Sequence, residues 1–265
     1  MGVLKKNHGG TAIAIACATA GTLMALAPTT GQALQVQVTI ENLAPVNGVY
    51  VTPLWVGFHD GSFDIYDVGS PAAEYLERLA EDGTTDDIMA AFTGLVQGTL
   101  TGPLAPGDIT SMVFSIDPSL ASSQYFSYGS MVIPSNDAFI ANDDPLAFRL
   151  FDDEGSFLGA NFFVLGNLVF DAGTEVNDEL PENTAFFGQM TPDTGVDENG
   201  VVHFHPGFLP PELGGILADP MFANGDFTIA GYPIAQIRVS AVPLPAALFL
   251  FAGGLGALGL TRRRK

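Results

Sequence analysis

Short runs of alternating apolar and polar residues constrain this chain more than any other feature of its sequence. The clearest run is Leu34–Glu41 (LQVQVTIE), and Ile234–Ser240 (IAQIRVS) near the other end alternates in a similar way. A side-chain period of two is the pattern of a β-strand with one buried face. Both runs are therefore predicted to be half-buried strands.

Further strand candidates lie between these two runs and are separated by clusters of Gly, Pro and Asp. They span residues 49–58, 110–116, 125–133, 146–151, 157–165, 200–205 and 226–230. Many short strands between turn residues favour an antiparallel arrangement in two packed sheets. The expected fold class is all-β, an antiparallel β-sandwich with one or two short helices, formed as a single domain by residues 34–241.

Two short helices are expected between the strands. Ser70 is a candidate N-cap with Pro71 in the first turn, and Gly83 is the expected end. The apolar residues between them at helical spacing are Tyr75, Leu76, Leu79 and Ala80. A second helix is expected to start at Thr85 and to run over residues 86–92.

The first 33 residues have the pattern of a secretory signal peptide. A basic start, an uncharged apolar run over residues 11–27 and a small-residue cleavage site at Gly31–Ala33 follow in the required order. The single cysteine, Cys17, lies in this segment. The mature domain is therefore expected to be exported and to contain no disulfide.

The end of the chain has three consecutive parts. Val242–Ala246 reads VPLPA, an uncharged apolar run extends to Leu260, and Arg262–Lys265 is basic. Residues 244–260 would span about 25 Å as a helix, which is the lower limit for crossing a bilayer. Residues 242–265 are thus predicted to hold a short proline-containing motif, a transmembrane helix and a basic tail on the cytoplasmic side.

This arrangement resembles the PEP-CTERM sorting tail in its VPLPA variant. The resemblance implies an exosortase-type processing protease that acts at Val242–Ala246, in a Gram-negative bacterium that makes exopolysaccharide. It also implies a protein that is secreted or held in the cell envelope. Membrane attachment is then expected only through this tail, in the inner membrane and before processing.

The charge distribution is strongly asymmetric. The whole chain has a formal net charge of −20, but residues 34–241 contain three Arg against all 29 Asp and Glu and so carry −26. Such a surface repels nucleic acid and attracts divalent cations. Solubility in a saline habitat explains the acidic excess equally well.

Four segments of the domain, in order along the chain, are similar to the spondin domain. They are Thr52–Gly61 (TPLWVGFHDG), Glu77–Gly83 (ERLAEDG), Met131–Phe139 (MVIPSNDAF) and Asp171–Glu175 (DAGTE). The resemblance covers about residues 36–240. It implies a sandwich like the calcium- and lipid-binding β-sandwiches, one bound Ca²⁺, and a role in extracellular matrix and adhesion.

The spondin resemblance assigns Asp137, Asp171 and Glu175 as metal ligands. Glu175 stands where the family has Asp, and its extra methylene changes the reach of the carboxylate. Ca²⁺ prefers six to eight hard oxygen ligands, and carboxylates from two loops would supply part of that shell. Gly173 would let the second loop wrap tightly. The alternative is that these are ordinary acidic turn residues.

The remaining acidic groups are interpreted as turns and surface loops. Two of them, Asp143–Asp144 and Asp152–Gly155, are typical of hairpin turns and lack the spacing of an EF-hand loop. The set of Asp60, Asp64 and Asp67 is expected at the surface, and residues 193–198 are expected to form a solvated loop.

Two further functions are weighed against calcium binding. An extracellular metal-dependent hydrolase would use His203 and His205 on one face of a strand, with His59 as a third ligand. The domain has no HExxH, GxSxG, P-loop or GxGxxG motif, so a non-enzymatic role is preferred. A carbohydrate-binding module would use exposed aromatic rings, but core packing is the preferred interpretation of those side chains. They are Trp55, Phe162, Phe163, Phe186, Phe187, Phe204 and Phe208.

These patterns together predict a secreted, non-catalytic, calcium-binding protein with an adhesion or biofilm-matrix role. Its expected partners, besides the processing protease, are exopolysaccharide or other surface proteins. Nucleic acid is not an expected partner.

Overall fold

The structure is a computed structural model that describes residues 33–243 as two antiparallel β-sheets and two short α-helices. The smaller sheet has four strands in the order β5–β1–β11–β8. These are β5 (Ile109–Ile116), β1 (Leu34–Asn42), β11 (Pro233–Ala241) and β8 (Ala160–Leu165). The first and last strands of the domain thus pair in the middle of this sheet, with Val38 opposite Val239.

The larger sheet has seven strands, six of them in the order β10–β9–β7–β6–β3–β4. These are β10 (His203–Phe204), β9 (Phe170–Asp171), β7 (Ala138–Ala141), β6 (Tyr125–Ile133), β3 (Leu54–His59) and β4 (Val96–Leu100). The two-residue strand β2 (Tyr50–Val51) pairs with one end of β6.

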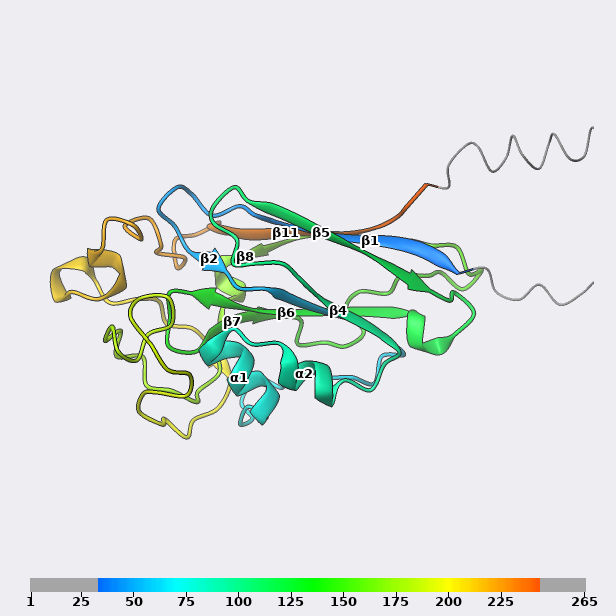
Figure 1. Cartoon of the computed structure of the whole chain (residues 1–265). Coiled ribbons are helices and arrows are strands. Elements are labelled where there is room, and N and C mark those ends of the chain that lie inside the picture. Colours follow the sequence, from blue (N-terminus) through cyan, green and yellow to red (C-terminus); the bar gives the residue numbers. More distant parts are fainter. Residues whose placement is uncertain (1–32, 244–265) are drawn as a thin grey trace, which may run out of the picture. The chain divides into compact units, whose positions relative to one another are not determined.

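The two sheets pack face to face, as Figure 1 shows. One cluster of buried side chains contains Val36 and Val38 from β1 together with Val56 and Phe58 from β3 and Phe126 from β6. The alternation of β1 places its apolar side chains in this core and its polar side chains on the opposite face. The expected all-β, antiparallel, sandwich-like fold is therefore confirmed for the described residues.

The helices α1 (Glu74–Asp82) and α2 (Asp86–Ala91) cover the outer face of the larger sheet. Leu76 and Leu79 of α1 pack there against Trp55 of β3 and Phe139 of β7. Because both faces of the larger sheet are covered, every residue of β3 is buried. Four single-turn 3₁₀ helices complete the structure: Ala121–Ser123, Gly166–Leu168, Pro211–Leu213 and Ile216–Ala218.

The helix predictions are confirmed except at one end. Gly83 terminates α1 in the left-handed conformation, and Thr85 directly precedes α2. The predicted start at Ser70 is wrong, because α1 begins only after Ala73. The Ser70 carbonyl instead accepts a hydrogen bond from the Val202 N–H at 2.9 Å, which keeps this residue in the loop beside β10.

Two predicted strands are absent from the described residues. Residues 146–151 make only isolated bridges, at Arg149 and Phe151. Residues 226–230 form turns, because the Asp226 carboxylate accepts the Thr228 N–H at 3.0 Å and competes with ladder pairing. Conversely, β4, β7 and β9 were not predicted.

The predicted signal peptide and sorting tail lie almost wholly outside the described residues. Of the VPLPA motif, only Val242 and Pro243 are described. Neither helix in residues 33–243 is both long and apolar enough to cross a bilayer.

Candidate metal centre

Strand pairing brings Asp137 and Asp171 to the same edge of the larger sheet. Asp137 directly precedes β7, and Asp171 is the last residue of β9. In the β7–β9 register Ala138 lies opposite Asp171, and the Ala172 N–H donates to the Asp137 carbonyl at 3.2 Å. Both side chains are fully buried. Two of the predicted ligands are therefore neighbours although 34 positions separate them in the sequence.

The Asp137 carboxylate organises the loop that follows β9. Its Oδ2 accepts the backbone N–H groups of Thr174 and Glu175 at 2.9 and 3.2 Å and the Thr174 hydroxyl at 3.3 Å. This contact draws Glu175, the third predicted ligand, to the side of Asp137. The predicted convergence of the two acidic segments is thus present.

Gly173 makes this loop geometry attainable. Its φ of +67° lies in the left-handed region, and a Cβ at this position would lie 2.5 Å from the Val201 carbonyl oxygen. Its N–H donates to Asp171 Oδ1 at 2.7 Å. The role expected for Gly173 in turning the loop matches this geometry.

Both oxygens of Asp171 already accept hydrogen bonds. Besides the Gly173 N–H, Oδ1 lies 3.5 Å from Nδ1 of His203, which is opposite Asp171 in the β9–β10 pair. The Asn177 side-chain amide donates to Oδ2 at 2.5 Å. This carboxylate is therefore held by the protein on both of its oxygens.

Asp137 and Glu175 each keep one oxygen free of any hydrogen bond. Asp137 Oδ1 and Glu175 Oε2 are the two side-chain polar atoms in residues 33–243 that are buried without a hydrogen-bond partner. The other oxygen of Glu175 accepts the Asn136 amide at 3.1 Å. Leaving a buried carboxylate oxygen unpaired is costly, and such atoms call for a bound water or ion.

Burial, together with repulsion from neighbouring charges, raises the pKa values of Asp137 and Glu175. Burial and the neighbouring charge of Asp171 raise the pKa of Asp137 to about 7. Burial raises the pKa of Glu175 to about 8, and the charges of Glu81, Asp137 and Asp178 add to this rise. A divalent cation among these groups would favour their charged forms and remove the penalty.

Glu81 of α1 is a buried member of the cluster that sequence reasoning did not identify. It is only 6% exposed, and burial raises its pKa to about 7, although the charge of Arg78 opposes this rise. Its charge also contributes to the raised pKa of both Asp137 and Glu175. A helical residue two positions after the buried Leu79 faces roughly the opposite side, so the apolar pattern predicts exposure. The one sequence feature that includes Glu81 is the segment ERLAEDG (Glu77–Gly83), which resembles the spondin domain.

Arg78 already neutralises the outer part of this acidic region. Its Nη2 lies 2.9 Å from Glu77, 2.7 Å from Glu81 and 3.0 Å from Asp193, and its Nη1 lies 2.6 Å from Asp82. Glu77, Glu81 and Asp193 are also the acidic triad, within the described residues, whose ligand oxygens all lie within 4.8 Å of one another. The guanidinium stands where a cation would bind these three carboxylates.

Asp137, Asp171 and Glu175 do not form such a close triad in the part of the chain described here. An ion held by all three would have to draw their oxygens closer together. Ligation by Asp137 and Glu175 is supported by their unpaired oxygens, whereas ligation by Asp171 rests on its proximity alone.

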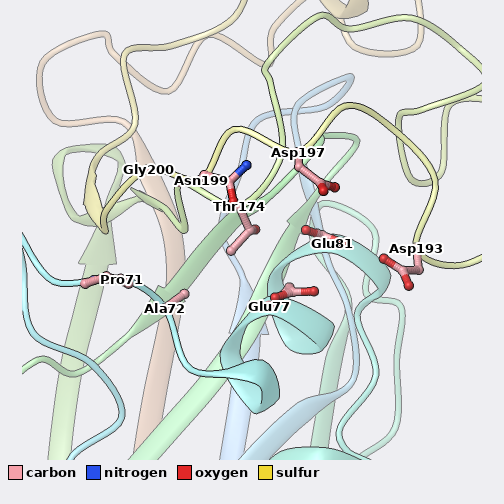
Figure 2. A pocket seen from close by; sticks show the side chains of 10 residues that line it. Pro71, Ala72, Glu77, Glu81, Thr174, Asp193, Asp197, Asn199 and Gly200 are labelled. Atoms are coloured by element: carbon pink, nitrogen blue, oxygen red, sulfur yellow. The ribbon is translucent and has the colours of Figure 1, made fainter.

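A cavity of about 490 Å³ opens beside the cluster. Figure 2 shows Glu77 and Glu81 on α1 facing the loop that carries Asp193 and Asp197, and Thr174 also lines this cavity. Residues 193–198 are largely exposed, as predicted for a solvated loop, but they are not isolated. The backbone of Asp197 forms an isolated antiparallel β-bridge with that of Glu175, and the Asp193 carboxylate forms an ion pair with Arg78.

Within residues 33–243, the histidines do not gather at one point. Four strand spacings separate β3, which carries His59, from β10, which carries His203, so the two strands lie about 19 Å apart across the sheet. Both ring nitrogens of His59 and of His205 are within hydrogen-bonding distance of protein groups. Burial lowers the pKa of each of these two histidines to about 4, so both are neutral. The proposed triad of histidine ligands is therefore wrong.

The aromatic residues divide into two groups. Trp55 is fully buried against Phe63 and Phe92, as core packing predicts. Core packing is wrong for three others, since Phe163, Phe186 and Phe204 are each at least half exposed. They lie on separate segments of the chain.

The other acidic residues considered from the sequence lie at the surface. Asp60, Asp64 and Asp67 are exposed, as are Asp143–Asp144, Asp153 and Glu154, and Asp152 is partly buried. The Asp152 and Asp144 side chains accept backbone N–H groups two residues onward, as turn residues do.

No protein-family model and no curated protein matches this chain. The likeness to the spondin domain and to the PEP-CTERM tail rests on the quoted sequence segments. Both resemblances enter the proposal below on that basis.

Proposed function

We propose that this protein is a non-catalytic, calcium-binding protein of the cell surface or extracellular matrix, with a spondin-like domain. One cation binds at the edge of the larger sheet, between the loops that contain Asp137 and residues 171–175. The observation that carries the proposal is the pair of unpaired, buried carboxylate oxygens on Asp137 and Glu175.

The donor set favours a hard cation. Asp137, Asp171 and Glu175 offer carboxylate oxygens, which suit Ca²⁺ better than the softer transition metals. Neutralising three crowded acids would also remove the burial penalty that raises the pKa values of Asp137 and Glu175. In this role the cation would tie the irregular segment after β9 to the sheet and stiffen it.

A binding role fits these groups better than a catalytic one. The carboxylates are deeply buried, and the described histidines are engaged in hydrogen bonds or scattered over the sheet. A matrix or adhesion role, with exopolysaccharide or surface proteins as partners, follows from the spondin likeness. Export and exosortase-type processing at Val242–Ala246 follow from the terminal segments.

Calorimetric titration of the purified full chain with CaCl₂ tests the proposal. A non-ionic detergent keeps the apolar residues 244–260 in solution. We expect one Ca²⁺ per chain in the wild type, no binding by Asp137→Ala, and weaker binding by Asp171→Ala. Asp67→Ala, which changes an exposed acid, is the control and should bind normally.

An absence of Ca²⁺ binding by the wild type would refute the proposal. Stoichiometric zinc in the purified protein would instead favour the metal-dependent hydrolase. Binding that persists unchanged in Asp137→Ala would show that calcium sits elsewhere on the acidic surface.

A further inference from the structure

The two unpaired oxygens do not complete a calcium site. Ca²⁺ takes six to eight oxygen ligands, and Asp137 Oδ1 with Glu175 Oε2 supply two. Asp171 already accepts hydrogen bonds on both oxygens, from Gly173 and Asn177. Another carboxylate near Asp137 and Glu175 would be a better direct ligand.

Glu81 lies beside this pair, but an ion would have to draw the three carboxylates closer together, because their oxygens are not all within 4.8 Å of one another. Glu81 is 6% exposed on α1, and its charge acts on both Asp137 and Glu175. Glu81 and Glu175 together line a small cavity of about 20 Å³, which has room for about one water or ion. Asp193, Thr194, Gly195 and Asp197 close the other sides of this cavity.

The segment that covers the cavity fits closely over Glu175. Gly195 has a φ of +144°, and a Cβ there would lie 1.8 Å from Glu175 Oε1. The Glu175 carboxylate is therefore confined between Gly195 and Asn136, whose amide donates to the same Oε1 at 3.1 Å. Confinement of this kind fixes the direction of a ligand before the ion arrives.

Arg78 supplies the counter-charge for Glu81 in the absence of an ion. Its Nη2 lies 2.7 Å from Glu81 Oε2, and the same guanidinium also contacts Glu77, Asp82 and Asp193. If Glu81 turns to an ion, Arg78 keeps three acidic partners. When Glu81 moves from Arg78 to the ion, neither Glu81 nor Arg78 is therefore left without an oppositely charged partner.

We propose that Glu81 is a direct ligand of the cation held by Asp137 and Glu175, so that the ion joins helix α1 to the loops at the edge of the sheet. This inference rests on the proposed calcium site and adds a ligand from a third segment of the chain. Asp171 then acts through its hydrogen bonds, by positioning Gly173 and Asn177. Figure 2 shows Glu81 on the face of α1 that meets the loop of Asp197.

Calcium titration of the full chain with matched variants tests this ligand. Glu81→Gln keeps the shape of the side chain and removes its charge, and Glu77→Gln makes the same change four residues earlier, at another Arg78 partner. Loss of groups that merely support metal ligands weakens binding about 10- to 100-fold, so loss of a direct ligand should weaken it by about 100-fold. We expect this loss for Glu81→Gln and a change under about threefold for Glu77→Gln.

The luminescence lifetime of Eu³⁺ in H₂O and D₂O gives a second readout, because it counts water molecules on the bound ion. Glu81→Asp retains the charge but shortens the reach by one methylene. We expect about one additional water on Eu³⁺ in both Glu81 variants, since water replaces the lost oxygen. A supporting role at a distance would leave the water count unchanged.

The outcomes separate this inference from the proposed function. If the wild type binds no Ca²⁺, both fail together. If Asp137→Ala loses binding while Glu81→Gln behaves like Glu77→Gln and Eu³⁺ gains no water, the calcium site stands and Glu81 is not a ligand. If Glu81→Gln does not fold, the calcium affinity and the Eu³⁺ water count of Glu81→Asp decide whether Glu81 is a direct ligand.

Discussion

The substitution Asp137→Asn should stabilise the metal-free protein at alkaline pH while abolishing its response to calcium. Asn has nearly the same shape as Asp, and its carbonyl oxygen can still accept the N–H groups of Thr174 and Glu175. Its amide can then point where Asp137 Oδ1 lacks a partner. A buried charge is removed without opening a cavity.

The size of the effect follows from the raised pKa of Asp137. Folding raises this pKa from 3.8 to about 7, and each pKa unit corresponds to ~1.4 kcal/mol. Because the folded state holds the proton more tightly, ionisation of Asp137 destabilises the wild type progressively as the pH rises from 4 to 7. The total is on the order of 4 kcal/mol above pH 7 and vanishes below pH 4.

Urea unfolding of wild type and Asp137→Asn in metal-stripped buffer at pH 8 and pH 5 measures this difference. We expect the variant to be more stable at pH 8 and the gap to shrink at pH 5. Calcium at 100 times its Kd should then stabilise the wild type by about 2.7 kcal/mol and leave the variant unchanged. Asp67→Asn controls for loss of a surface charge. A variant that is less stable than the wild type at pH 8 without metal would refute the reasoning.

Three further predictions concern Arg78, Gly195 and the tail. Arg78→Gln leaves Glu77, Glu81 and Asp193 without their shared cation, so we expect the free energy of unfolding to fall by about 3–5 kcal/mol in metal-free buffer. Differential scanning calorimetry should show that added Ca²⁺ partly restores this stability. An equal loss with and without Ca²⁺ would contradict the reasoning. Gly195→Ala pushes a methyl group into the Glu175 carboxylate and should weaken calcium binding about tenfold, whereas Gly214→Ala, also at positive φ but in open space, should not. Intact-mass spectrometry of the secreted protein should find an N-terminus near residue 34 and a C-terminus at or before Ala246, and an intact tail in the secreted form would contradict the proposed processing.

Strands with one buried face could be read from the sequence almost to the residue. The alternation of Leu34–Glu41 identified β1, and the predicted strand over residues 110–116 agrees with β5 to within one residue. The predicted limits of β6, which is buried on both faces, also agree with Tyr125–Ile133. β4 was missed because Val96–Leu100 contains Gly98 and is only partly buried, so it carries no clear period. β9 has two residues, which is too short for any periodicity. In residues 226–230 apolar character was mistaken for a strand, although Phe227 is buried from within a turn.

The candidate site was only partly predictable from the sequence, because its residues are brought together by tertiary structure. The motifs around Asp137 and Asp171 identified two acidic segments, but their meeting depends on β7–β9 pairing between distant positions. Glu81 could not be found from helical periodicity, because the residues that bury it come from the irregular segment near Thr174 and Asp197 rather than from the sheet. Sequence periodicity describes the face that an element turns to the core. It does not describe a second face that a long loop later covers.

Arg78 is one of three arginines among residues 34–241, and its side chain is largely shielded from solvent within its group of acids. At 0.1 M salt, interactions between exposed charges more than about 10 Å apart are largely screened, whereas shielded pairs are screened far less. Rising ionic strength therefore relieves the repulsion among the many surface carboxylates while the contacts of Arg78 persist. The folded domain should withstand brine better than fresh water, and this tolerance comes from placing a scarce positive charge inside and leaving the abundant negative charges outside.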